Sequence, residues 1–337
     1  MDAEEIDLLT GSLRSVFAEG GTDVPGQLRG LGWDDVTAAD PAWATTLLFT
    51  EKGRALSAAA LLDDAVLPLL RAGRPGSVPD GADLVCYPSP GSGGRPSSTP
   101  LGVTGILLRQ PGPDERLVIP VADVGGVTLA VAPASAFTVA PLPSLDNSAD
   151  WYAVSGPTPA ARHEGAAWAA AVAAAHRALA AELIGTAERA LELAVEHTSA
   201  RRQFNAPIAA FQAVRHRLAD GYVAIAAARA LLAASFGDGS GPEGIAAAAA
   251  KARAGRAHAL VSASAVQVCG AMGATLEHPL HQYVNRGAVL DGLLGSSGEL
   301  TAELGTVVRA TVAAGGELPL LVKVRLRVRT IPTAPTG

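Results

Sequence analysis

A long alanine-rich segment in the second half of the chain constrains the fold more than any other sequence feature. Along it, mostly larger side chains recur every three or four residues, at Trp168, Val172, His176, Leu179 and Leu183, and the same stripe continues to Ala187. This spacing places them on one stripe of a helix that can continue to Ala200, far beyond the average globular helix. His176, Arg177 and Glu182 interrupt its apolar character, so it is unsuited to spanning a membrane. The segment predicts a helix buried among other helices.

Three further helices are predicted after this segment, and together they complete a C-terminal four-helix bundle. An Asn-Ala-Pro sequence at residues 205–207 suits a helix cap followed by an early-turn proline. The next helix would span about residues 243–268, where Gly270 and Gly273 end it. The last is expected over residues 297–314.

The first half of the chain has two different compositions. Residues 3–71 carry helical patterns, with a first amphipathic helix and a second helical run over 42–71. The following residues are rich in Gly, Pro and Ser around short apolar runs bounded by turn residues, which is typical of strands. We therefore predict a mainly α protein with four regions: an N-terminal helical domain (1–71), a small middle β-domain (72–160), the bundle (161–318) and an extended or disordered basic tail (319–337).

Charge and cysteine content argue against several classes of protein. The formal net charge is −6 and Lys and Arg are scattered, so the basic stripe of a nucleic-acid-binding protein is missing. Cys86 and Cys269 lie far apart and outside any CxxC or Cys/His sequence cluster, so neither a disulfide framework nor a metal site is predicted. The acidic N-terminus lacks the features of a signal peptide. These features fit a protein of the reducing cytoplasm that binds neither nucleic acid nor membrane.

Two local motifs and the order of the regions resemble the acyl-CoA dehydrogenases. The first motif is Arg-Arg-Gln-Phe-Asn-Ala-Pro-Ile at residues 201–208, followed by Phe-Gln-Ala-Val at 211–214 and Leu-Ala-Asp at 218–220. It is similar to the family's RxQFGxPIxxFQxVxxxLAD segment. The second is Gln-Val-Cys-Gly-Ala-Met-Gly at 267–273 with Glu-His-Pro-Leu at 277–280, similar to the family's QxxGGxG and the EyP stretch beyond it. The resemblance spans most of the chain.

The resemblance implies a set of residues that hold FAD across a subunit interface. Arg201 would pair with the pyrophosphate, Gln203 would hydrogen-bond it, and Phe204 would pack on the dinucleotide. Gln267, Gly270 and Gly273 would contribute a polar side chain and close backbone approach. A guanidinium matches phosphate oxygens in a fork, and glycine permits close contact, so the chemistry suits these roles. The alternative is that Arg201 is a solvated charge at a helix end and Phe204 a core anchor.

The sequence departs from the family where a catalytic base is required. Abstraction of the proton alpha to the thioester needs a carboxylate, which most members carry as a Glu before the final helix. The matching position holds Leu294, and the alternative position on the first long bundle helix holds Ala175. His176 follows Ala175 but is expected to be a packing residue, and Asp291 and Glu299 flank Leu294 without matching the base's register. No catalytic residue is therefore predicted.

The middle domain also departs from the family. The loop at residues 86–92 resembles the TEPxxGSD loop but lacks its Thr and Glu, Gly93 stands where Asp would be, and no WITN-like segment follows. The resemblance is to the shorter, degenerate subunit of actinobacterial steroid-type dehydrogenases, which form α2β2 heterotetramers. It implies a Glu-bearing partner subunit, FAD, an acyl-CoA substrate and electron-transfer flavoprotein as acceptor. The alternatives are a protein of the same fold with a different reaction and a non-enzymatic scaffold subunit.

Overall fold

A computed structural model of the 337-residue chain describes residues 3–19, 23–71, 83–237 and 244–315. Five helices open the chain: α1 (Ala3–Glu19), α2 (Val24–Gly30), α3 (Trp33–Ala39), α4 (Pro41–Arg54) and α5 (Leu62–Arg71). The predicted apolar face of α1 buries Leu13, Val16 and Phe17. The helical run predicted over 42–71 is interrupted between α4 and α5, because Leu56 takes a left-handed conformation (φ 51°).

The middle of the chain folds into two small sheets, as its turn-rich composition predicts. The first sheet has the order β1-β3-β4-β7 and the second β2-β6-β5. Apolar side chains of both sheets, Leu107, Leu117 and Ile119 among them, form one buried cluster. The strands are β1 (Leu84–Val85), β2 (Val103–Leu107), β3 (Arg116–Asp123), β4 (Gly126–Pro133), β5 (Thr138–Leu142), β6 (Trp151–Gly156) and β7 (His163–Glu164).

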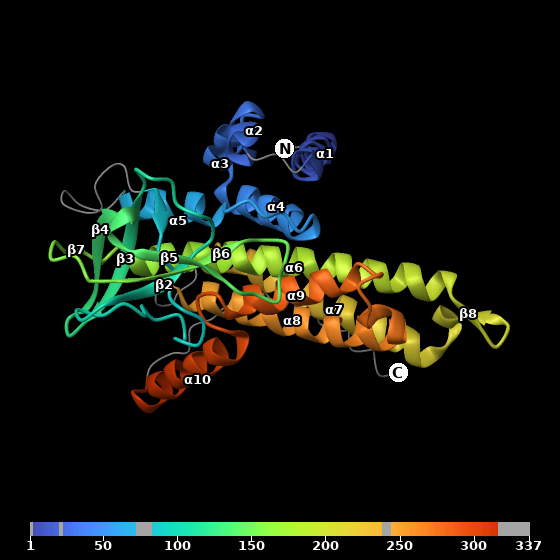
Figure 1. The fold of residues 1–337 in the computed structure, drawn as a ribbon. Coiled ribbons are helices and arrows are strands. Elements are labelled where there is room, and N and C mark those ends of the chain that lie inside the picture. The colour runs from blue at the N-terminus through green and yellow to red at the C-terminus, as the bar shows by residue number, and fades with distance from the viewer. Residues whose placement is uncertain (1–2, 20–22, 72–82, 238–243, 316–337) are drawn as a thin grey trace, which may run out of the picture.

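The predicted long helix is α6 (Trp168–Ala200), which lies at the centre of the molecule (Figure 1). It packs against α4 on one side and, on the other, against α7 (Gln212–Ala234), α8 (Ile245–Cys269) and α9 (Leu280–Gly292). The crossing with α4 is close because of two glycines. A Cβ on Gly185 would overlap the Thr50 carbonyl oxygen, and one on Gly53 would overlap that of Glu182.

The fourth helix of the bundle differs from the prediction. It is α9, which sequence periodicity did not reveal, rather than the helix expected over 297–314. That helix forms as α10 (Ser297–Ala313), but it packs on α8 to one side of the bundle and buries only Leu300 among its described side chains (Figure 1). The predicted tail lies outside the described residues.

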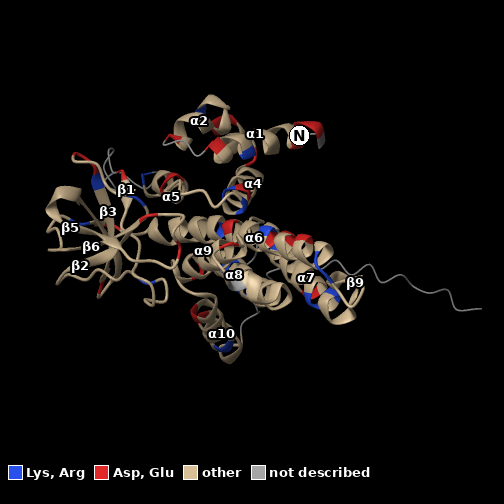
Figure 2. Cartoon of the chain, turned by 45° about the vertical axis from the view of Figure 1, so that its right-hand side comes forward, with Lys and Arg blue, Asp and Glu red and all other residues tan. Residues whose placement is uncertain are grey.

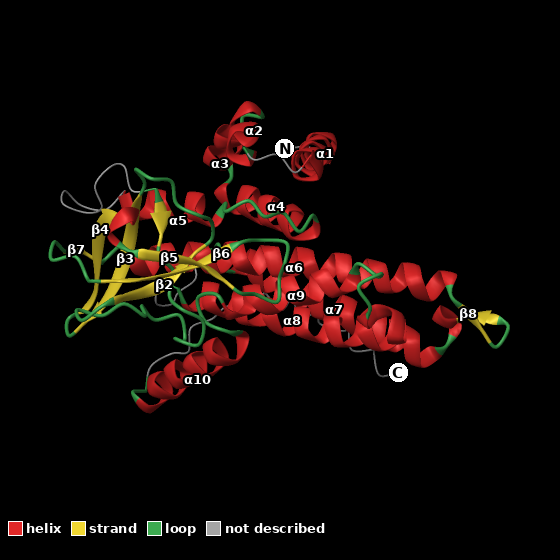
Figure 3. Ribbon diagram, viewed as in Figure 1, coloured by secondary structure: helices red, strands yellow, loops and turns green. Residues whose placement is uncertain are grey.

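Charges and secondary structure are distributed as the sequence predicts. Figure 2 shows acidic and basic residues interspersed over the described elements, without a stripe of one sign. Figure 3 shows the sheets at one end of the bundle and a short hairpin at the other. No described helix is both long enough and apolar enough to cross a membrane.

Candidate functional site

The first motif forms an exposed hairpin beyond the C-terminus of α6. Strands β8 (Arg202–Gln203) and β9 (Ala206–Pro207) pair across a turn in which Phe204 and Asn205 have φ of 51° and 61°. Asn205 is therefore a turn residue and not the predicted helix cap. Helix α7 starts later, at Gln212, after the 3-10 turn η2 (Ile208–Ala210). Asparagine tolerates this left-handed conformation, whereas it is uncommon for phenylalanine.

The predicted contact residues of this motif are open to solvent. Arg201 is the C-cap of α6, its side chain is exposed, and among the described residues it makes no ion pair. Gln203 is exposed, and the Phe204 side chain is 89% exposed. Phe204 touches Phe211 edge to face, with ring centroids 6.2 Å apart. The alternative that Phe204 anchors the core is wrong, whereas a solvated Arg201 is what the isolated chain shows.

The second motif lies where α8 ends. Gln267 is exposed on the last turn, and Gly270 is the C-cap with φ 62° and ψ −146°, a conformation open almost only to glycine. Gly273 is buried in the 3-10 turn η3 (Gly270–Ala274), and a Cβ on it would lie 2.7 Å from Cβ of Cys269. Both predicted glycines are thus required by the local backbone.

The fold brings the two motifs together although about 60 residues of chain separate them. His197, one turn before Arg201, contacts His278, just beyond the second motif, with ring centroids 5.6 Å apart. Gly270 begins a turn that leads toward this contact. We call this end of the bundle, with residues 197–204 and 267–278, the distal end. Figure 1 shows that it lies opposite the chain's own β-sheets.

The two positions at which a base was sought meet at the other end of the bundle. Leu294 is 1% exposed and Ala175 is fully buried. Nε2 of His176, the residue after Ala175, lies 2.9 Å from the Leu294 carbonyl oxygen, which it can reach only as a donor. Burial lowers the pKa of His176 to about 4, and its Nδ1 has no hydrogen-bond partner. His176 is therefore a neutral imidazole that holds a backbone turn.

The neighbouring carboxylates are committed to helix capping. Oδ1 of Asp291 accepts from the Ser297 amide at 3.1 Å, and Glu299 forms a capping box with Ser296 at the start of α10. Lys251, which is fully buried, donates to the carbonyl oxygens of Asp291 and Gly295. Side chains of α6, α8 and α9 thus hold the turn at Leu294.

The loop of the β-domain packs directly on this turn. Gly91, Gly93 and Gly94 all have positive φ, and a Cβ on Gly94 would lie 2.7 Å from the Leu294 carbonyl oxygen. Backbone therefore contacts backbone between this loop and the position at which the base was sought.

A buried ionic network closes the space between the helical regions. The Arg286 guanidinium bonds Asp146 at 2.8 Å and Glu182 at 2.7 Å, and Lys52 bonds Glu182 at 2.7 Å. All four residues are at most 4% exposed. Burial would raise the pKa of Glu182, but the adjacent cations Lys52 and Arg286 outweigh it and hold that pKa below its usual value. The only sequence signal for this network was Glu182, a charged residue within an alanine-rich helical segment.

Beside this network lies a cavity of about 20 Å³, lined also by Leu108, Trp151 and Leu179. A cavity of this volume holds about one water molecule, whereas small-molecule sites measure roughly 300–1,000 Å³. The junction of α4–α5, α6, α9 and the sheets is therefore filled by the chain's own side chains.

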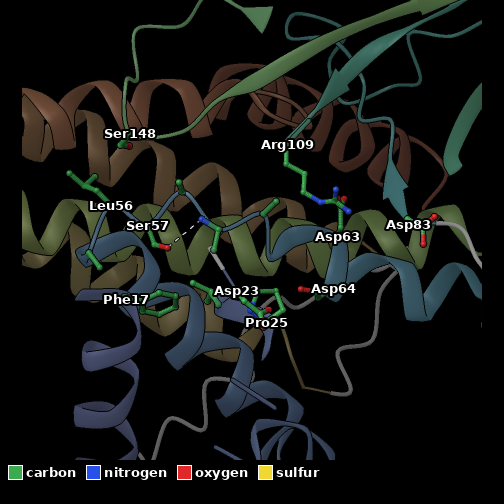
Figure 4. Close-up of a pocket in the computed structure, with 15 residues that line it drawn as sticks. Phe17, Asp23, Pro25, Leu56, Ser57, Asp63, Asp64, Asp83, Arg109 and Ser148 are labelled. Atoms are coloured by element: carbon green, nitrogen blue, oxygen red, sulfur yellow. Dashed lines mark hydrogen bonds between the residues drawn. The ribbon is translucent and has the colours of Figure 1, made fainter. Parts of the chain in front are cut away.

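A larger cleft of about 820 Å³ lies between α1–α2, the α4–α5 link and the end of β2 (Figure 4). Figure 4 shows Arg109 reaching toward Asp63, while Arg109 is also paired with Glu115 at 2.7 Å. Oδ1 of Asp63 accepts from the Tyr87 hydroxyl at 2.8 Å, and burial raises the pKa of Asp63 to about 7. Sequence reasoning did not single out this cleft, because its residues come from segments far apart.

Comparison with known proteins relates the bundle of this chain to one enzyme family. Residues 163–302 match the family described as acyl-CoA dehydrogenase, C-terminal domain. The chain is 43% identical over 126 residues to acyl-CoA dehydrogenase IpdE2 of Mycobacterium tuberculosis, covering 37% of this chain and 39% of that protein. It thus spans about two fifths of the length of this relative. The bundle is therefore similar to the C-terminal domain of the acyl-CoA dehydrogenases.

Solved structures confirm the predicted fold over nearly the whole chain. A variant described as the Tcur3481-Tcur3483 steroid ACAD matches with a TM-score of 0.77 and 23% identity, over 92% of this chain and 99% of that one. The ChsE4-ChsE5 complex of Mycobacterium tuberculosis matches with a TM-score of 0.69 and 20% identity, over 92% and 98% of the two chains.

Proposed function

We propose that this chain is the subunit of a heteromeric acyl-CoA dehydrogenase that lacks the catalytic base and completes the FAD site of a Glu-bearing partner. The enzyme would remove hydrogen from the alpha and beta carbons of an acyl-CoA thioester, with FAD accepting the hydride and electron-transfer flavoprotein reoxidising it. Enzymes of this family bind FAD, which supports the choice of cofactor. The observation that carries the proposal is the distance between the distal end and the chain's own β-sheets.

The distal end has the groups that a dinucleotide needs but faces away from the rest of its own chain (Figure 1). Arg201 offers an unpaired guanidinium, Phe204 an exposed ring, and Gly270 a backbone without a side chain. A guanidinium pairs with pyrophosphate through forked, charge-assisted hydrogen bonds, and an aromatic ring packs on the apolar part of the cofactor. Because the sheets lie at the opposite end, the flavin that these residues serve would belong to another subunit.

The end of the bundle next to the sheets supports the proposal that this chain lacks the catalytic base. Proton abstraction requires an ionisable group, and Leu294 and Ala175 have none. Asp291 and Glu299 are used as caps, and the cavity beside the ionic network around Arg286 has a volume of only about 20 Å³. Within this chain, FAD would therefore be contacted through Arg201, Gln203, Phe204, Gln267, Gly270 and Gly273.

The names of two similar solved structures support a heteromeric assembly for this chain. Two of the solved structures that match over nearly the whole chain carry the names of two gene products each, and one of them is described as a steroid ACAD. A steroid side-chain CoA ester is accordingly the substrate class to test first. The assembly to expect is an α2β2 heterotetramer.

The test compares the lone chain with the chain co-expressed with a Glu-bearing dehydrogenase from an adjacent gene. We expect the lone chain to be free of flavin and inactive, and the complex to contain FAD and oxidise acyl-CoA. Arg201→Ala should weaken FAD binding by the complex roughly 10- to 100-fold, because one charge-assisted hydrogen bond contributes about 1.5–3 kcal/mol. Arg309→Ala, at an exposed arginine of α10, is the matched control.

Each alternative predicts a different result. Flavin and dehydrogenation in the lone chain would refute the proposal. A complex whose FAD content is unchanged by Arg201→Ala would support a scaffold subunit. Turnover of acyl-CoA only with a different electron acceptor or to a different product would support another reaction on the same fold.

A further inference from the structure

Three side chains with metal-ligand chemistry converge at the distal end. They are His197 in the last turn of α6, Cys269 at the end of α8 and His278 shortly before α9. One ligand atom from each lies within 4.8 Å of the other two. The cysteine is buried and both histidines are half-buried, so the group is shielded from solvent on the side of the bundle.

The sequence could not predict this group, because its members lie far apart and follow no ligand-spacing motif. The fold creates it by ending α6 and α8 side by side. Among the described residues, neither Sγ of Cys269 nor the ring nitrogens of His197 have a hydrogen-bond partner. Two of the three groups thus retain their lone pairs for another interaction.

The distances are close to those of a zinc site. Zinc binds thiolate sulfur at about 2.3 Å and imidazole nitrogen at about 2.0–2.1 Å, which places tetrahedral ligand atoms roughly 3.4 Å apart. Side-chain rotations that move the ligand atoms by about 1 Å would close the observed group to that size. The backbone of α6 and α8 need not move, since His197 and His278 are long side chains at helix ends.

His278 needs one adjustment to act as a ligand. Its Nδ1 accepts a hydrogen bond from the Leu280 amide at 3.2 Å, and its carbonyl oxygen lies 2.8 Å from Nδ1 of His281. Leu280 is the first residue of α9, so its amide is one of the donors that a helix leaves unpaired. Coordination by His278 replaces that bond, because Nδ1 then either binds the metal or carries the ring proton.

We propose that His197, Cys269 and His278 bind a divalent cation such as Zn²⁺. The fourth coordination position of the metal would be open to water or to an anion. Cys269 coordinates as the thiolate, and its proton is released to solvent. The metal connects the ends of α6 and α8 to the segment that precedes α9. It therefore fixes Arg201, four residues from His197, relative to Gly270, next to Cys269, in the arrangement that the two motifs need.

The test uses the untagged full-length chain without partner or flavin, so its result is independent of the proposed FAD role. The chain is loaded with Zn²⁺, dialysed against metal-free buffer and assayed for bound metal. We expect about one Zn²⁺ per chain. Replacement by Co²⁺ should give the visible bands of a tetrahedral ion and a thiolate-to-cobalt charge-transfer band.

Variants identify the ligands. Cys269→Ser should abolish the charge-transfer band, and His197→Gln and His278→Gln should each reduce retained metal below half of the wild-type amount. Cys86→Ser and His216→Gln, at a cysteine in the β-domain and an exposed histidine of α7, should retain it in full. His197→Gln lies near the surface, so a folded variant is available if Cys269→Ser fails to fold. Wild-type chain that retains no metal, or a Co²⁺ spectrum without a thiolate band, would overturn the proposal.

Discussion

Nε2 of His176 donates to the carbonyl oxygen of Leu294 across 2.9 Å, and this bond joins the first long helix of the bundle to the turn where a catalytic Glu was sought. The family's two possible base positions are therefore neighbours in space, and in this chain both are used for packing. The bond thus holds the turn before α10 against α6.

Replacing His176 by Gln should change how stability depends on pH. The pKa of His176 is about 4 in the folded chain, and a free histidine has about 6.5. Because the unfolded chain binds the proton first, stability is complete above pH 6.5 and falls as the pH decreases toward 4, by up to about 3 kcal/mol. His176→Gln keeps a donor for the Leu294 carbonyl but does not titrate, so this loss should disappear.

Urea unfolding at pH 5 and pH 7.5 measures that effect. His216→Gln, at an exposed position on α7, should leave the wild-type difference between the two pH values in place. An equal difference in wild type and His176→Gln would show that His176 is not a buried neutral imidazole.

Restoring a carboxylate at Leu294 should not restore catalysis. The side chain at this position is 1% exposed, and the nearby cation of Lys251 already bonds two carbonyl oxygens. Leu294→Glu should destabilise the chain by about 3–5 kcal/mol, the cost of a buried charge without a partner. Leu294→Met, similar in size, should cost less than about 1.5 kcal/mol. Acyl-CoA oxidation by the lone Leu294→Glu chain would contradict this account.

Breaking the ionic network at Arg286 should destabilise the fold strongly. Arg286→Met leaves Asp146 buried without its cation and Glu182 with Lys52 alone, which should cost about 3–5 kcal/mol in chemical denaturation. Arg229→Met removes a surface pair with Glu188 and should cost less than about 1 kcal/mol. If both variants unfold at the same urea concentration, the network does not hold the helical regions together.

Replacing Asp63 by Asn should have the opposite pH signature to His176. The pKa of Asp63 is about 7 when folded, against about 3.9 in an unfolded chain. The folded state keeps the proton longer, so stability is complete below pH 4 and is lost as the pH rises to 7. Asp63→Asn retains the acceptor for Tyr87 and should remove this loss, whereas Asn at exposed Asp35 should not. Thermal unfolding at pH 4.5 and 7.5 distinguishes the two variants.

The elements that could be predicted are those whose signal is local. The periodic side chains of α6 gave its full length, and Gly270 marked the end of α8 because its backbone angles suit only glycine. The register alone places Leu294 where the family carries its base, and this assignment stays a prediction.

The features that could not be predicted depend on partners distant in sequence. Helix α9 carries Arg286, which reads as a surface charge until Glu182 and Asp146 are placed beside it. Asn205 has the sequence of a helix cap, but pairing of β8 with β9 draws it into a turn. The His197–Cys269–His278 group exists only because two helices end at the same place.

The length of helix α6 also separates the effects of substitutions near its two ends. His176 and Arg201 are 25 positions apart on a continuous helix, which corresponds to about 38 Å along its axis. Residues that far apart without shared contacts contribute additively to stability. A substitution in the hairpin should therefore leave the folding of this polypeptide intact, and under the proposed function its effect would be confined to the FAD of the partner subunit.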